Sequence, residues 1–193
     1  MQIIDPWSPV ILKDNFQIDW ETVYPRIRNL LDSVKINSEL EIGGTSSVTS
    51  NQYGNNPIEW PEFGELQQYI DSKLPEIISA WKLPRARYAP KKSWINEHPT
   101  GAYTEEHVHK NVQVVISYYL KFPKDGGRLL VRDPAEAYWI NYPSEKRGLD
   151  EFWYPVDIQT GDIVFFPGWL SHKTEPNKSA ENRYVLSVNY SLL

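Results

Sequence analysis

The sequence predicts a mainly β protein with flanking helices, folded as one domain. From about residue 86 onward, short strand-like runs bounded by Gly, Pro and Asp follow one another without a helix between them. Helical periodicity is confined to the residues before that point. This order favours an antiparallel sheet or barrel with the helices packed outside. A chain of 193 residues also suits one sizeable core better than two.

Two helices are predicted in the first 85 residues. Asp19 can cap the first, over residues 20–35, in which Pro25 is expected to end a first turn or to cause a kink. The second begins at Pro61 and has apolar residues at steps of three and four: Phe63, Leu66, Ile70, Leu74, Ile77, Ile78 and Trp81. Residues 41–57 between them are rich in Gly, Ser, Thr and Asn, which predicts a surface loop or, alternatively, a mobile lid.

Six strand-like runs make up the second half of the chain. They cover residues 92–98, 112–122, 127–133, 137–142, 161–167 and 182–192. Alternation places Tyr119 on the polar face of the second run, and Arg183, Ser187 and Asn189 on the polar face of the last. Such a face meets water in a one-sided sheet. Tyrosine, arginine and nearby histidines instead favour a cavity for a small anionic ligand.

The composition excludes several classes of protein. The net charge of −5 gives no reason to expect nucleic acid or an anionic membrane as a partner. Cysteine is absent, which excludes disulfides, thiolate metal ligands and a cysteine nucleophile. The N-terminus is a poor signal peptide, and no apolar run approaches the length of a membrane span. We therefore expect a soluble, cytoplasmic protein.

The stretch "EEHVHKNVQ" (105–113) contains two histidines at i and i+2, just before a strand. If the strand continues back through this stretch, His107 and His109 project to the same side. His172, after a later strand and turn, can supply a third imidazole. A single histidine is usually a core or surface residue, but three of the four histidines lie at strand ends. The pattern predicts a metal site formed by His107, His109 and His172.

Two stretches of the sequence resemble a known family. "HVHKNVQVVISYYLKFPKDGGRLLVRDP" and "TGDIVFFPGWLSHKTEPNKSAENRYVLSVNY" look like the catalytic half of the 2-oxoglutarate and Fe(II) dependent dioxygenases, nearest to the prolyl 4-hydroxylase-like branch. The shared features are a histidine, a YYL strand, a Gly-Gly turn, an FF strand, a distal histidine and an arginine. Here these are His107, Tyr119, Gly126 with Gly127, Phe165 with Phe166, His172 and Arg183. The resemblance covers residues 92–193.

The resemblance implies a double-stranded β-helix, a cupin-like jelly-roll barrel. Residues 86–193 would form the catalytic core, and residues 1–85 a helical support and loop. It implies Fe(II) held by His107, position 109 and His172, with 2-oxoglutarate chelating the iron. Arg183 would grip the far carboxylate, because a guanidinium fork matches a carboxylate. Tyr119 would donate a further hydrogen bond, and Ser187 would assist.

Position 109 departs from the family pattern, which has an acid there. The usual triad of two histidines and one carboxylate leaves positions open for cosubstrate and O₂. With His109 as the third ligand the site loses an anionic donor, and three imidazoles also suit zinc or copper. Alternatively, Glu105, Glu106 or Asp133 supplies the anionic ligand and His109 lies next to the ligands without contacting the metal, or the site binds no iron.

The resemblance implies an oxygenase that uses O₂ and 2-oxoglutarate to hydroxylate a peptide, an amino acid or another small molecule, releasing succinate and CO₂. The alternatives are a three-histidine, cupin-like dioxygenase without 2-oxoglutarate, and a non-catalytic, metal-stabilised binding module. Trp94, Asn96 and Gln113 are candidate pocket residues, and His98 is expected in a loop. Substrate choice is expected to depend on residues 41–58 and 135–155.

Overall fold

The computed structural model describes residues 11–49, 56–134 and 152–193. The helices are α1 (Trp20–Asp32) and α2 (Gly64–Ala80), preceded by the 3₁₀ turns η2 (Pro57–Glu59) and η3 (Pro61–Phe63). The strands are β1 (Leu12–Asn15), β2 (Glu41–Ile42), β3 (Thr45–Ser46), β4 (Tyr88–His98), β5 (Tyr103–Thr104), β6 (Val114–Lys121), β7 (Leu129–Arg132), β8 (Trp153–Val156), β9 (Asp162–Pro167), β10 (His172–Thr174) and β11 (Arg183–Leu192).

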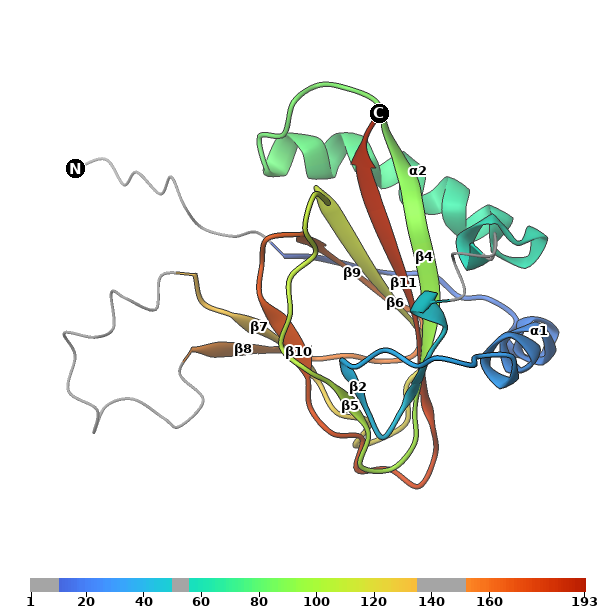
Figure 1. Ribbon diagram of the computed structural model, residues 1–193. Helices are drawn as coiled ribbons and strands as arrows, with labels where there is room; N and C mark the ends of the chain where they lie inside the picture. Colours follow the sequence, from blue (N-terminus) through green and yellow to red (C-terminus); the bar gives the residue numbers. More distant parts are fainter. Residues whose placement is uncertain (1–10, 50–55, 135–151) are drawn as a thin grey trace, which may run out of the picture.

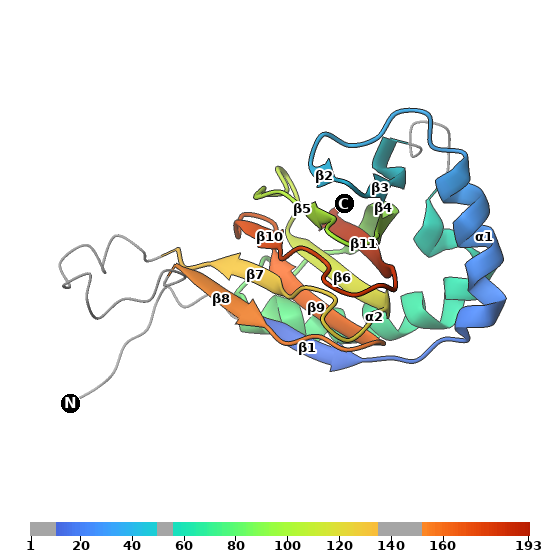
Figure 2. The same cartoon turned by 90° about the horizontal axis from the view of Figure 1, so that it is seen from below.

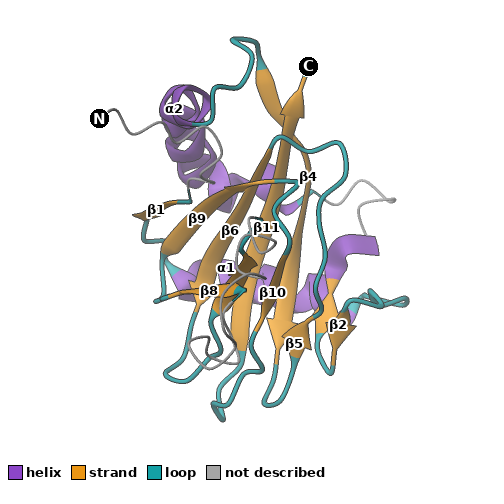
Figure 3. Cartoon of the chain, turned by 90° about the vertical axis from the view of Figure 1, so that its left-hand side faces the viewer, coloured by secondary structure: helices purple, strands orange, loops and turns teal. Residues whose placement is uncertain are grey.

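The strands form three antiparallel sheets. The largest has the order β1-β9-β6-β11-β4-β3, a second has the order β10-β7-β8, and β2 pairs with β5. Figure 3 shows β9, β6, β11 and β4 side by side in the large sheet. Neighbours in this sheet come from distant parts of the chain, so the order of its strands brings the two sequence motifs described above together.

The two faces of the large sheet belong to two separate cores. On one face, Ile116, Tyr118 and Leu186 pack against apolar residues of α1 and α2. On the other, Tyr119 and Val185 pack against the residues of β7 and β8. Figures 1 and 2 show α1 and α2 lying beside the large sheet, with β7, β8 and β10 on its other side. The predicted alternation of faces along β6 and β11 is thus present.

Helix α1 is fixed at its start and along its length. The carboxylate of Asp19 accepts a hydrogen bond from the backbone N–H of Glu21, as the capping prediction required. The helix continues through Pro25 rather than ending there. One turn further on, Arg28 donates to the buried carboxylate of Glu97 on β4, with 2.7 Å between Nη1 and Oε1. This ion pair connects the helix to the large sheet.

The first half of the chain contributes strands as well as helices. β1 pairs with β9 at one edge of the large sheet, and β3 pairs with β4 at the other. Residues 41–46, expected in a loop, therefore include two short strands that border the cavity described below. The predicted strand 137–142 lies outside the described residues, as does most of segment 135–155. None of the described helices is long and apolar enough to cross a membrane.

Candidate metal and cosubstrate site

A cavity of ≈ 240 Å³ opens between the large sheet and the two smaller ones. Alternate residues of β4, β6 and β11 form its floor. The polar face predicted for the strands at residues 112–122 and 182–192 therefore faces the cavity. Lining residues central to the site are Trp94, His107, His109, Tyr119, His172 and Ser187. A cavity below about 300 Å³ is small for a ligand site. It suits a small cosubstrate together with the reacting end of another molecule.

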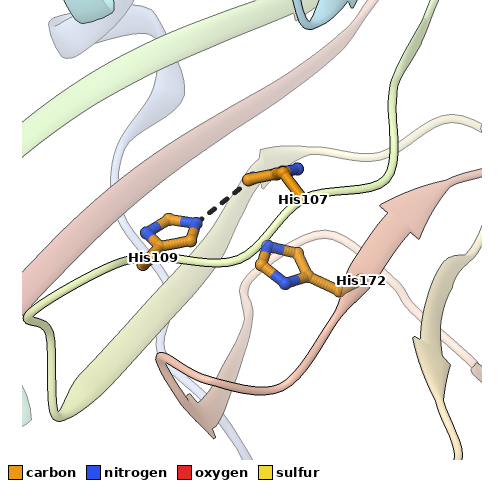
Figure 4. Close-up of side chains that lie close together, drawn as sticks. All are labelled: His107, His109 and His172. Carbon is orange, nitrogen blue, oxygen red and sulfur yellow. Dashed lines mark hydrogen bonds between the residues drawn. The ribbon is translucent and has the colours of Figure 1, made fainter.

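The three predicted histidines meet at this cavity. One nitrogen from each of His107, His109 and His172 lies within 4.8 Å of the other two. His107 and His172 are held together by a backbone bridge, with N···O distances of 3.0 and 3.1 Å. Figure 4 shows the rings pointing toward one another, His107 and His109 from one segment and His172 from the start of β10. The strand does not run back through residues 105–113, yet the two side chains still face the same space.

Each imidazole is oriented by a hydrogen bond at its Nδ1 atom. The Nδ1 atoms of His107 and His172 lie 2.8 Å from the carbonyl oxygens of Glu105 and Leu170. That of His109 lies 2.7 Å from Oδ1 of Asn189 on β11. These oxygens only accept, so each Nδ1 carries the proton and each Nε2 keeps a free lone pair. A partner at one ring nitrogen that directs the other is typical of metal-binding histidines.

The Nε2 atoms of His107 and His109 are spaced like two ligands of one metal ion. The Nε2 atoms of His107 and His109 are 3.2 Å apart, a repulsive contact for two lone pairs unless a cation or proton lies between them. Two nitrogens bound at about 2.1 Å to one ion are about 3.0 Å apart at a right angle and about 3.4 Å apart at a tetrahedral angle. The observed separation lies within this range.

Burial keeps two of the rings neutral. It lowers the pKa of His109 to about 4, with the nearby His107 contributing, and it lowers the pKa of His172. Neutral imidazole is the form that binds metals. Aromatic neighbours reinforce this environment, because Trp94 stacks on His109 and Phe166 packs edge-on against His172.

No carboxylate joins the cluster among the described residues. Glu106 accepts from Arg132 and Ser171 instead. Glu105 accepts from Tyr103, and Asp133 lines a different hollow. The metal-ligating group found in the described part of the chain consists of the three histidines alone. The geometry therefore favours His109 over a neighbouring acid as third ligand.

Arg183 is completely buried and does not itself line the cavity; it lies behind the lining residues His98 and Thr174, both of which accept hydrogen bonds from it. Its Nη1 donates to carbonyls of the Gly126–Gly127 turn and of Glu175, and its Nη2 donates to Oγ1 of Thr174. Gly127 has φ of +81°, and a Cβ there would clash with the carbonyl oxygens of Glu175 and Pro176 and lie 2.8 Å from Nη1 of Arg183. Only glycine therefore fits at position 127. One Nη2–H remains, so a two-pronged grip on a carboxylate would require these bonds to rearrange.

Three hydroxyls on the cavity wall are available to a ligand, two of them near Arg183. Burial raises the pKa of Tyr119, so its hydroxyl stays protonated, and it has no hydrogen-bond partner among the described residues. Thr174 accepts from Arg183 and from the backbone of Thr104, which leaves its own proton free to donate. Ser187 is buried on the same wall and likewise has no side-chain partner within the described ranges. Unpaired buried donors beside a guanidinium suit a carboxylate.

A buried hydrogen-bond network next to Arg183 was not predicted from the sequence. His98 was expected in a loop, but it ends β4, is 1% exposed and lines the cavity. Its Nδ1 accepts from Nε of Arg183, so its Nε2 carries the proton and donates to Glu41 at 2.7 Å. Thr104 also donates to Glu41. Only the pairing of β2 with β5, which has no periodic signal, brings these residues together.

The other residues proposed to line a pocket differ in where the structure places them. Trp94 and Asn96 both line the cavity, as proposed. Gln113 does not, because its side-chain oxygen accepts from the backbone N–H of Leu192 at the far end of β11. Of the segment 41–58, Glu41, Ser46 and Val48 line the cavity.

Several solved structures of known proteins share the fold of this chain. A prolyl-4-hydroxylase from Pseudomonas putida has a similar structure, with a TM-score of 0.61 at 13% identity, over 95% of this chain and 92% of that one. HygX from Streptomyces hygroscopicus, solved with nickel and 2-oxoglutarate, has a TM-score of 0.59 at 13% identity, over 94% and 82%. A prolyl hydroxylase from Trichoplax adhaerens, in complex with a hypoxia inducible factor peptide fragment, has a TM-score of 0.57 at 15% identity, over 94% and 83%.

These structures define the class: the fold is the double-stranded β-helix of 2-oxoglutarate oxygenases, as predicted. The model of the family described as putative 2OG-Fe(II) oxygenase matches residues 92–189. The chain belongs to this family, whose cofactors are Fe(II) and 2-oxoglutarate. None of the curated proteins has a matching sequence.

Proposed function

We propose that this chain is an Fe(II)- and 2-oxoglutarate-dependent oxygenase that hydroxylates a small molecule or the end of a peptide, using His107, His109 and His172 as the iron ligands. One observation carries the proposal: three Nε2 lone pairs converge at a cavity that is also lined by free hydroxyl donors, with the buried guanidinium of Arg183 directly behind its wall. The metal ligands and the anion-binding end are separate parts of one site, which is what a chelating dicarboxylate requires.

The protein's own groups would hold iron at the three histidines and the far carboxylate of 2-oxoglutarate toward Arg183. Iron with 2-oxoglutarate supplies the oxidising power for C–H hydroxylation, with release of succinate and CO₂. Tyr119 and Thr174 would donate to the far carboxylate, and Arg183 would supply the positive charge behind it. Ser187 would assist from β11. Because Arg183 is fixed by backbone carbonyls, it would present that charge without reorganisation.

Charge balance supports the dianionic cosubstrate. Three neutral imidazoles leave the two positive charges of Fe(II) uncompensated by the protein, whereas a carboxylate ligand would cancel one of them. 2-Oxoglutarate carries two negative charges: the chelating carboxylate would offset one charge of the iron, and the far carboxylate would offset that of Arg183, in a cavity where unpaired charge is costly. The absence of an acid at position 109 is therefore compatible with this family's chemistry.

The test is oxygen consumption by the iron-loaded protein with and without 2-oxoglutarate, with succinate measured in parallel. We expect consumption to require 2-oxoglutarate and to produce one succinate per O₂. His172→Ala is expected to abolish both, because it removes the ligand at β10. Consumption that is independent of 2-oxoglutarate would support the three-histidine dioxygenase instead. Stoichiometric metal binding without oxygen uptake under any condition would support a binding module.

A further inference from the structure

Lys92 is a half-buried ammonium that the iron and cosubstrate roles leave unused. It lies on β4 at the opposite end of the inward-facing row Lys92, Trp94, Asn96 and His98, and it lines the cavity. Nζ lies 5.9 Å from the Trp94 ring, and within the described ranges no carboxylate or hydrogen-bond acceptor pairs with it. Burial alone lowers its pKa. A partly desolvated cation without a counterion is a place where an anion gains affinity.

The sheet register places Lys92 and Arg183 at opposite ends of the inward-facing rows of β4 and β11, with His109 near the Lys92 end. Lys92 pairs with Asn189, whose side chain holds His109, whereas Arg183 pairs with His98 six residues along β4. At about 3.3 Å per residue, these two pairs are about 20 Å apart along the strands. A cosubstrate bound between the iron and Arg183 would leave the Lys92 end free for the molecule to be oxidised.

The cavity wall is positive although the protein is not. Among the described residues, Lys92 and Lys110 line it against the single carboxylate of Glu41, whereas the ammonium of Lys173, which also borders the cavity, lies over the Trp153 ring outside it. Glu41 is committed to His98 and Thr104 at the far end. The whole chain has a net charge of −5, so the lysines of the cavity oppose the general charge of the molecule. A cavity of this kind concentrates anions.

We infer that Lys92 binds a carboxylate of the primary substrate, so that the substrate is a small carboxylic acid or the C-terminal end of a peptide. This rests on the proposed function, because it takes the Arg183 end as the cosubstrate's. One flexible ammonium matches the single negative charge of a carboxylate, whereas a phosphate monoester carries a charge of about −1.5 to −2. Trp94 and Val108, which also line the cavity, offer apolar surface to the rest of such a molecule.

The experiment uses two probes that differ only in charge, N-acetyl-leucine and N-acetyl-leucinamide. Their Kd values are measured by saturation-transfer NMR on protein loaded with Mn(II) and saturated with 2-oxoglutarate. We expect the acid to bind about tenfold more tightly than the amide, the value of one charge-assisted hydrogen bond. Lys92→Met should remove this preference and Lys92→Arg should keep it. Lys91→Met is the matched control, because Lys91 is exposed next to Lys92 and does not line the cavity.

Equal affinity for the acid and the amide in the wild type, or a preference that survives Lys92→Met, would overturn the inference. So would stronger displacement of the acid by inorganic phosphate than by acetate. Metal content and 2-oxoglutarate affinity are measured in the same samples. If neither cofactor binds while the Lys92-dependent preference persists, the proposed function fails and the anion site stands. If both cofactors bind and the preference is absent, the anion site alone is wrong.

Discussion

Two adjacent tyrosines on β6 allow the cosubstrate site to be tested separately from the fold. The Tyr119 hydroxyl faces the cavity and has no hydrogen-bond partner in the described part of the chain. The Tyr118 hydroxyl, on the opposite face, donates to the carbonyl of Phe16 at 3.0 Å. Each change to phenylalanine removes one oxygen atom from a buried ring. Only Tyr119→Phe removes it from the proposed cosubstrate site.

The expected effects are opposite for the two variants. Tyr119→Phe should weaken 2-oxoglutarate binding by about ten- to hundredfold, because a hydrogen bond to a charged group contributes about 1.5–3 kcal/mol. Its free energy of unfolding should stay within about 0.5 kcal/mol of the wild type, since no bond within the protein is lost. Tyr118→Phe should lower the free energy of unfolding by about 1 kcal/mol and leave 2-oxoglutarate binding unchanged.

Calorimetric titration of the metal-loaded protein with 2-oxoglutarate measures the first quantity, and urea unfolding measures the second. An unchanged Kd in Tyr119→Phe would refute the assignment of this hydroxyl to the cosubstrate. A loss of affinity of the same size in both variants would show that the effect comes from the packing of β6. Tyr119 is a cleaner probe than Arg183, because substitution of Arg183 leaves several buried carbonyls unpaired and is expected to destabilise the protein.

Three further predictions concern the metal, the helix contact and acid stability. His109→Asp should retain one iron per chain, whereas His109→Ala should lose it; unchanged metal content in His109→Ala, measured by elemental analysis, would exclude position 109 as a ligand. Glu97→Gln should lower the free energy of unfolding in urea by about 2–3 kcal/mol, because the buried carboxylate accepts from Arg28, Asn182 and Tyr184; a loss below about 0.5 kcal/mol would contradict this. Arg128 holds the pKa of Glu175 at about 2, below its unfolded value of 4.5. The stability from this pair is present above pH 4.5 and is lost as the pH falls toward 2. The difference in the free energy of unfolding between wild type and Glu175→Gln, about 1 kcal/mol after allowing for solvent screening, should therefore shrink to zero over that range. A difference independent of pH would contradict this.

The sequence predicts the parts of the site that depend on local periodicity. Alternation along β6 and β11 places Tyr119 and Ser187 on one face, and the structure has both on the cavity wall. His107 and His172 could be linked because each lies next to a strand and the ordered motifs resemble a known barrel. These features need no knowledge of which strands are neighbours.

The parts that escaped prediction depend on contacts between distant short segments. β2 and β5 have two residues each, too few for any alternation, yet their pairing places Glu41 and Thr104 against His98. The carbonyls that hold Arg183 come from the turn after β6 and the segment after β10, so its limited donor capacity is a property of tertiary structure. The sequence alone does not reveal that most N–H donors of this guanidinium are already hydrogen-bonded within the protein.

Iron and 2-oxoglutarate are proposed to share one site, built from the three histidines and from the cavity wall in front of Arg183. Anaerobic calorimetric titration of 2-oxoglutarate into the protein, with and without one equivalent of Fe(II), measures this coupling. We expect tight binding of one 2-oxoglutarate per chain that requires Fe(II) and disappears in His107→Ala. Binding of equal strength without metal, or unchanged in His107→Ala, would show that the two do not share a site.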